Sequence, residues 1–194
     1  MKIKFIAFSL ILLNTLVACN TTKQVSRVDE KTQIDLSGRW NDSDSRLVSE
    51  EMVQDALSRP WLNDFVQAEA KKPYIIVGLV RNKSSEHINS ETFIKDIERE
   101  FINSGKVKVV QGGEAREEIR SERADQQDYS SLSTLKKWGL EKGADYMMQG
   151  TINSITDANS KVKVVFYQVD LELTDIETNE KVWIGSKKIK KVIQ

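Results

Sequence analysis

The sequence has 194 residues, of which 39% are hydrophobic, and its 29 basic side chains are matched by 29 acidic ones. This length suits one domain with its own core, and the cancelled charge excludes a protein held on nucleic acid by bulk electrostatics. A single histidine and a single cysteine also exclude a His/Cys zinc cage, an internal disulfide and a Cys–His nucleophile pair.

The first residues have the pattern of a secretory signal peptide. Lys2 and Lys4 lead into an apolar run at 5–17, and the small residue Ala18 ends it. About 13 apolar residues are too few to cross roughly 30 Å of hydrocarbon, so a retained transmembrane helix is the weaker interpretation. We therefore expect residues 1–18 to be a signal peptide.

The signal peptide leads into Leu16-Val17-Ala18-Cys19, which resembles a bacterial lipobox. In that class of lipoprotein, cleavage precedes the cysteine and its sulfur carries a diacylglycerol. The resemblance therefore makes Cys19 the lipid attachment site and the link to a membrane. Asn20 follows, where an aspartate is the usual inner-membrane retention signal in enterobacterial lipoproteins, so the resemblance implies the outer membrane.

A polar tether is predicted between this anchor and the folded domain. Residues 20–36 lack aromatic side chains and any sustained hydrophobic period, which is typical of a flexible chain. Fully extended, they reach at most about 55 Å, at roughly 3.3 Å per residue. We assign residues 19–36 to the lipid-anchored tether and residues 37–194 to one globular domain.

Two helices are predicted at the start of this domain, within residues 37–73. The first begins near Ser43, carries an apolar face at 48, 52 and 56, and ends at Arg59-Pro60. Pro60 suits the first turn of the second helix, whose apolar residues are Trp61, Leu62, Phe65 and Val66. We expect both helices to pack on a core formed by residues 74–194.

That core begins with a strand, a helix and a second strand. The apolar run Tyr74 to Val80 predicts a central strand that is buried on both faces. After a loop at 81–89, Phe93, Ile97 and Phe101 repeat every four residues in a helix that Gly105 ends. A second strand is predicted at 107–111, which gives one right-handed parallel crossover.

Gly112-Gly113 then turns the chain into a helix of interleaved Glu and Arg at 114–127. Its apolar line is thin, so we expect it to be exposed and available to a partner. A further helix is predicted from Ser131 or Ser133 to Gly143.

Three strands are predicted at 146–155, 162–174 and about 181–190, joined by polar turns in an antiparallel meander. In the middle strand the apolar residues alternate with polar ones, so one face of the sheet is either partly wet or covered by a partner. The fold class is α+β, an α/β sandwich with a mixed four- to five-stranded sheet flanked by helices.

Two motifs of known enzymes occur in incomplete form. Gly112-Gly113 lacks the third glycine of a dinucleotide-binding loop and is interpreted as a turn. Ser133-Thr134-Leu135-Lys136 matches the Ser-x-x-Lys of penicillin-binding enzymes, but no partner motif is present, and Ser133 is interpreted as a helix cap.

The remaining ionisable residues also favour a plain explanation. His87 lies in a polar loop and is expected to be solvated, and most carboxylates stand beside a cation at helical spacing, as Glu117 does with Arg120. We therefore predict no catalytic residue, no metal or cofactor site, no nucleic-acid partner and no small-molecule substrate.

The last strand is basic because it carries Lys187, Lys188, Lys190 and Lys191. Two interpretations remain open: a surface for an acidic partner or phospholipid, or a strand end whose charge discourages edge pairing.

The chain resembles the LpoB-type penicillin-binding-protein activators in several blocks. They are the lipobox, Leu36-Ser37-Gly38-Arg39-Trp40, the strand at 75–80 leading to Arg81-Asn82, residues 140–146 with Gly150, residues 171–175 and residues 179–185. Together these blocks cover nearly all of the chain from about residue 36.

The resemblance implies a four-stranded mixed sheet with flanking helices, similar to the N-terminal domain of TolB, in which the strand predicted at 107–111 is an edge or an extended connection. It implies a noncatalytic outer-membrane lipoprotein that binds a class A penicillin-binding protein and stimulates glycan polymerisation and crosslinking. Enterobacterial members have a long proline-rich tether, whereas residues 20–36 are short and contain no proline. As candidate partner contacts we take Arg81, Asn82, Arg116, Arg120 and Arg123.

Two alternatives stay open at this point. A secretion or assembly lipoprotein of the curli-pore kind would share a related core fold, but it needs additional amphipathic strands of about nine to eleven residues. A carboxylate-based cell-wall hydrolase would need two carboxyl groups within about 10 Å in one cleft.

Overall fold

A computed structural model describes residues 24–131, 133–134, 136 and 141–194, and the chain divides into two units between Thr32 and Gln33. The described residues before Gln33 are exposed and contain no helix or strand. All helices and strands described below belong to the unit Gln33–Gln194.

The centre of this unit is a mixed five-stranded sheet with the order β2-β1-β3-β4-β5. Its strands are β1 (Tyr74–Asn82), β2 (Lys108–Val109), β3 (Tyr146–Ala158), β4 (Lys163–Asp175) and β5 (Lys181–Ile193). β1 pairs in parallel with β2 and β3, whereas β3, β4 and β5 form an antiparallel meander. The predicted parallel crossover and the predicted meander are both confirmed.

Four helices accompany the sheet in the described residues: α2 (Asp42–Leu57), α3 (Pro60–Glu69), α4 (Ser90–Ser104) and α5 (Gly113–Tyr129). The α2 helix begins with a capping box, in which Asn41 and Asp44 each accept a bond from the other's backbone N–H. Pro60 occupies the first turn of α3, and Gly105, with φ +63°, ends α4 in the left-handed region. The α+β prediction is confirmed.

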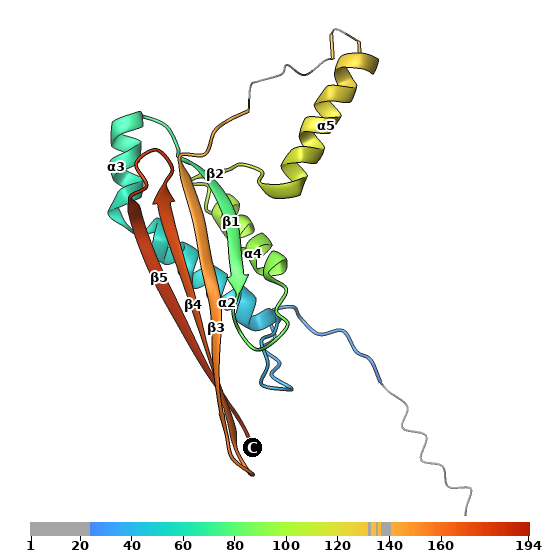
Figure 1. Ribbon diagram of the computed structural model, residues 1–194, viewed down its shortest axis with the longest axis vertical. Coiled ribbons are helices and arrows are strands. Elements are labelled where there is room, and N and C mark those ends of the chain that lie inside the picture. The colour runs from blue at the N-terminus through green and yellow to red at the C-terminus, as the bar shows by residue number, and fades with distance from the viewer. Residues whose placement is uncertain (1–23, 132, 135, 137–140) are drawn as a thin grey trace, which may run out of the picture. The chain divides into compact units, whose positions relative to one another are not determined.

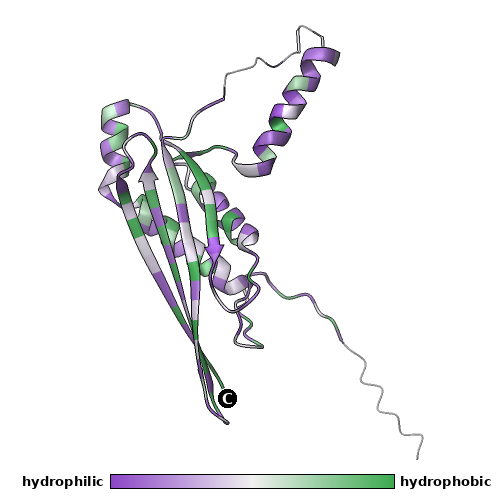
Figure 2. Cartoon of the chain, in the orientation of Figure 1, coloured by the Kyte–Doolittle hydropathy of each residue, from purple (hydrophilic) through white to green (hydrophobic). Residues whose placement is uncertain are grey.

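The core lies between one face of the sheet and the helices α2 and α4 (Figure 1). The odd-numbered residues of β4 from Val165 to Leu173 are all buried, as the alternation predicts. From α4, the side chains of Phe93, Ile97 and Phe101 are fully buried. Figure 2 shows the alternation of hydrophobic and hydrophilic residues along the strands.

The opposite side of the sheet, here called the open face, carries the even-numbered residues of β4 and β5 and the odd-numbered residues of β3. Ile155 and Ile184 on this face are more than two-thirds exposed. The predicted burial of β1 on both faces is therefore wrong for Leu79, which is 64% exposed. The register shifts between Val77 and Val80, and a bulge of this kind locally reorients the strand.

Other differences concern the length of elements. The strand predicted at 107–111 is shorter in the structure, where β2 is Lys108–Val109 at the sheet edge. The helix predicted from Ser131 or Ser133 to Gly143 falls partly on residues 132, 135 and 137–140, which lie outside the described residues. Within that stretch, 133–134 form a turn and 141–143 are irregular.

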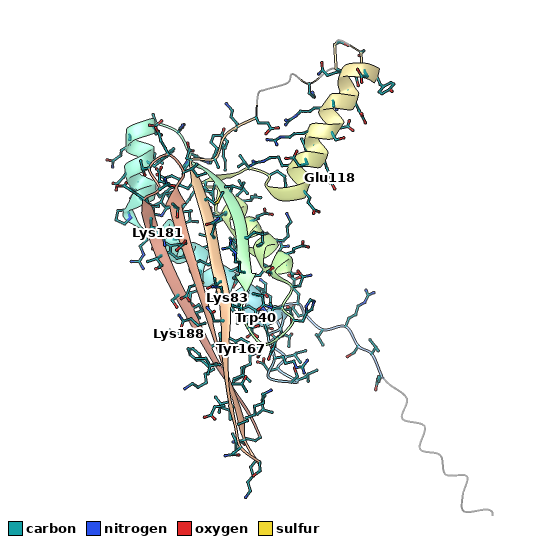
Figure 3. All side chains as sticks on the ribbon, viewed as in Figure 1. Trp40, Lys83, Glu118, Tyr167, Lys181 and Lys188 are labelled. Atoms are coloured by element: carbon teal, nitrogen blue, oxygen red, sulfur yellow. The ribbon has the colours of Figure 1, made fainter. Side chains whose placement is uncertain are left out.

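The segment just before α2 is attached to the core by Trp40. Its indole N–H donates to Ser45 Oγ at 2.8 Å, and its ring meets Phe93 and Tyr167 edge-on. Trp40 and Tyr167 lie close to each other in Figure 3. Burial raises the pKa of Tyr167 well above its ordinary value, so this phenol stays neutral.

Candidate partner-binding surfaces

The three candidate arginines of α5 share one face of that helix because they are four and three residues apart. Arg120 binds Glu141 with Nε and Nη2, at 3.2 and 3.1 Å, and Arg123 Nη1 lies 2.6 Å from the same carboxylate. Arg116 Nε donates to the backbone oxygen of Gln111 at 2.7 Å. The structure therefore brings all three arginines together.

These contacts favour the charged forms of Arg120 and Glu141. The hydrogen bond from Arg120 lowers the pKa of Glu141, and the hydrogen bond to Glu141 raises the pKa of Arg120. A hollow of about 150 Å³ is lined by Arg116, Ile119 and Arg123 together with 110–111 and 141–142. None of the residues of α5 is buried. A charged surface with an apolar centre results.

Arg81 lies elsewhere, on the open face of the sheet. It lines a hollow of about 130 Å³ with Gln149, Thr151, Ile184 and neighbours. On the same face, Glu172 accepts a hydrogen bond from Lys181 Nζ at 2.6 Å, and Asp170 accepts from Gln168. Two separate polar surfaces therefore carry the candidate arginines.

Asn82 has a role in the loop that follows β1. Its side-chain nitrogen donates to the backbone oxygen of Glu86 at 2.7 Å, and its oxygen accepts from both the backbone N–H and the hydroxyl of Ser84. The polar atoms of Asn82 are thus used within the chain, in contrast to Arg81.

Sequence reasoning missed the contacts between α2 and β5. Trp183 Nε1 donates to Asp55 Oδ2 at 2.7 Å, Lys187 pairs with Glu51, and Lys191 Nζ lies 2.6 Å from Asp44 Oδ2. The two residues of each pair are 128 to 147 positions apart in the sequence, so no local spacing predicts these contacts. The four-residue spacing of Trp183, Lys187 and Lys191 on one strand face is the signal that could have found them.

The Lys191 contact is the most buried of these. Its side chain is 10% exposed, and it binds Asp35 Oδ1 at 2.6 Å and the backbone oxygen of Arg39 at 3.0 Å as well as Asp44. Burial acts to lower the pKa of Lys191, but the hydrogen bonds with Asp35 and Asp44 outweigh it and raise the pKa. Asp35, which sequence analysis placed in the tether, is thereby attached to β5.

Three carboxyl groups of the described residues have pKa values that are shifted away from the range of a general acid. A general acid needs a raised pKa, whereas hydrogen bonds from Lys191, Trp183 and Arg120 lower the pKa values of Asp35, Asp55 and Glu141 respectively. His87 is exposed, and Gly112 is the N-cap of α5, which begins at Gly113. Within the same residues, no cluster of His, Cys, Asp or Glu has the geometry of a metal site.

Cys19, the predicted lipid attachment site, lies outside the described residues, as does the predicted signal peptide at 1–18. Among the described helices, none combines the length and the hydrophobicity needed to cross a membrane.

Sequence comparison identifies one family. A family model described as the peptidoglycan-synthase activator LpoB matches residues 44–189, from α2 to β5. No curated protein sequence matches the chain.

Comparison with solved structures finds three examples of interest. The NMR structure of LpoB from E. coli has a TM-score of 0.43 and 14% identity, covering 91% of this chain and 87% of that one. The C-terminal domain of LpoB from Salmonella enterica has a TM-score of 0.36 and 16% identity, covering 67% and 93%. Lipoprotein GNA1162 from Neisseria meningitidis has a TM-score of 0.41 and 15% identity, covering 62% and 83%.

Proposed function

Because the chain belongs to the LpoB family of peptidoglycan-synthase activators, we propose that it binds a class A penicillin-binding protein and stimulates peptidoglycan synthesis. The family is noncatalytic, in agreement with the prediction that this chain is not an enzyme. The observation that carries the proposal is the extent of the family match, which runs from α2 through β5. It favours an activator over a secretion pore or a hydrolase.

The proposed setting is the periplasmic face of the outer membrane. Residues 1–18 are removed, Cys19 carries the lipid, and the domain that follows the tether faces the periplasm. At about 0.8 kcal/mol per buried methylene, stable anchoring needs at least two acyl chains. Because Asp35 binds Lys191, the tether between Cys19 and this contact is residues 20–34, which reach at most roughly 50 Å when fully extended.

The proposed mechanism is a shift between conformations of the synthase. An activator acts in this way only if it binds the active conformation more tightly than the inactive one. We assign the contact to the arginines of α5, Arg116, Arg120 and Arg123, with Arg81 and Asn82 on or beside the open face as further contacts. The α5 arginines come first because that helix has no buried residue.

The function is tested with the full chain in detergent and a class A synthase from its own organism. We expect direct binding and faster glycan polymerisation in the presence of the chain. The proposal fails if every class A synthase of that organism neither binds the chain nor changes its rate.

The α5 contact is tested by charge reversal. Arg116→Glu and Arg123→Glu are expected to weaken stimulation because both side chains lie on the exposed helix. Glu141→Gln is the matched control, since it removes the internal partner of Arg120 and Arg123 but keeps both cations. If Glu141→Gln weakens stimulation as much as Arg123→Glu does, Arg123 acts by holding residue 141 and does not touch the synthase.

The anchor is tested separately with Cys19→Ala. We expect this variant to lose labelling by radioactive palmitate and to move from the membrane fraction to the soluble fraction. Retention of the label in Cys19→Ala would refute the anchor without affecting the binding experiment.

A further inference from the structure

No strand of the described residues lies beside the outer edge of β5, although β5 is 13 residues long. Its inner edge pairs with β4 over nearly its whole length. On the outer side, no backbone hydrogen bond of residues 181–193 joins it to any other described segment. A free strand edge of this length is a template for an added strand.

A continuous groove runs along this edge, between β5 and α2. Its first hollow, of about 370 Å³, is lined by the consecutive residues 183–187 of β5 and by Glu51, Met52 and Asp55 of α2. A second, of about 440 Å³, shares Glu51 and Lys187 with the first. A third, of about 350 Å³, is lined by 189–193 of β5 and by Gln33, Asp44 and 35–38, so the segment before α2 lies beside this end of the strand. Because consecutive strand residues line the first and third hollows, they open onto the strand edge itself.

The side of the groove that faces α2 contains an apolar patch. Leu47, Val48 and Ile189 line the second hollow beside Glu50, Glu51 and Gln54, and Leu47 is 41% exposed. The cations on this side, Lys187 and Lys191, are already paired with acidic residues of α2 and with Asp35. An added strand would therefore need apolar side chains here.

The other side of the groove, on the open face of the sheet, is basic. Lys188 and Lys190 are two residues apart on this side and exposed, and no ion pair to either occurs among the described residues. Lys188 projects from β5 in Figure 3. An added strand would present every second side chain beside these two lysines, where acidic residues are favoured.

A second copy of this chain does not fit the edge in the symmetric register. If two β5 strands paired antiparallel about Ile189, Lys187 would face Lys191 and Lys188 would face Lys190. Like charges directly opposite each other are destabilising. The lysines thus exclude self-pairing at this position and select for a segment of opposite charge.

We propose that the free edge of β5 binds an extended segment of a partner protein, in which acidic residues toward the open face alternate with apolar residues toward α2. The segment adds a sixth strand through main-chain hydrogen bonds, and its alternating side chains provide specificity. This binding mode does not depend on the α5 contact or on the identity of the synthase.

The test uses the full chain in detergent and a synthetic peptide of about nine residues, the length of an ordinary strand, in which valine and glutamate alternate. Hydrogen exchange is followed by mass spectrometry. We expect slower exchange of amides at 181–193 with this peptide. A peptide with lysine in place of glutamate should bind at least about tenfold more weakly by fluorescence anisotropy.

Two controls decide the mechanism. A glutamate peptide that is N-methylated at alternate residues lacks the donors for strand pairing and should not protect β5. Lys188→Glu combined with Lys190→Glu should reverse the preference in favour of the lysine peptide, and both positions are exposed, so the fold is retained.

Three results would overturn the proposal. Protection by neither peptide means that the edge does not accept a strand. Equal protection by both means that the lysines do not select the partner. Protection of β5 only by vesicles of anionic lipid would assign the basic strand to a membrane surface.

Discussion

The helices α4 and α5 have similar lengths, 15 and 17 residues, but they relate to the sheet in opposite ways. α4 buries Phe93, Ile97 and Phe101 completely, whereas α5 buries no residue. In α4 the core enforces the helix, while α5 is held by hydrogen bonds and exposed ion pairs, which add little to stability. The difference shows that the core fixes the position of α4 more firmly than that of α5.

The ends of α4 are also better capped than the start of α5. The side chain of Asn89 caps α4 by accepting from the backbone N–H groups of Glu91 and Thr92, and Gly105 ends it. α5 begins at Gly112 without a side-chain cap. Local opening of α5 should therefore cost less than local opening of α4.

Phe93→Ala should have the largest effect on stability. The substitution removes a ring that is 0% exposed and that meets Trp40 edge-on, which leaves a cavity in the core. We expect a loss of about 3–5 kcal/mol in the free energy of unfolding, measured by urea denaturation. A loss below about 1 kcal/mol would mean that α4 does not depend on the core.

Lys191→Ala extends the comparison to ion pairs. It leaves the carboxylate of Asp44, 7% exposed, without its cation, and we expect a loss of about 3 kcal/mol. The matched control is Arg120→Ala, which breaks an exposed pair on α5 and should leave the melting temperature nearly unchanged. Equal effects of the two variants would contradict the distinction between buried and exposed pairs.

Asp35 should make stability depend on pH. The hydrogen bond from Lys191 lowers its pKa from 3.8 to about 2 in the folded chain. Its contribution is therefore fully present above pH 3.8 and is lost as the pH falls through about 2. Denaturation series between these values should show a weaker pH dependence for Asp35→Asn than for the unchanged chain.

Ile119→Ala in α5 should have the smallest effect. Ile119 is 43% exposed, so we expect a change within about 0.5 kcal/mol. Hydrogen exchange in the same sample should be faster for α5 than for α4. Slow exchange in α5 would indicate a contact that holds it more firmly than its ion pairs do.

The elements predicted best from the sequence are those in which burial has a period. Phe93, Ile97 and Phe101 predicted α4, and the alternation from Val165 to Leu173 predicted β4, because each places one face in the core. Gly105 ended its helix as expected, since glycine adopts a positive φ without strain.

Prediction failed where distant parts of the chain determine the structure. The exposure of Leu79 follows from a register shift against β3, and the short β2 follows from its limited pairing with β1. Neither depends on the local pattern of hydrophobic residues. The pairing of Asp35 with Lys191 spans 156 residues and likewise leaves no local trace.

For the candidate surfaces, the sequence placed Arg116, Arg120 and Arg123 in one predicted helix. It could not show that Glu141 binds both Arg120 and Arg123, because these contacts join residues 21 and 18 positions apart. The sequence showed only that the last strand is basic and did not show the groove beside β5. Its second wall is α2, which lies more than 100 residues earlier in the chain.

The contact of Lys191 with Asp35 and Arg39 also has a mechanical meaning. Any tension on the chain before Gln33 acts first on the short segment from Asp35 to Arg39. Lys191 transmits this force to the end of β5, which is bonded to β4 along the length of both strands. Part of the pull is therefore distributed over a sheet of long strands.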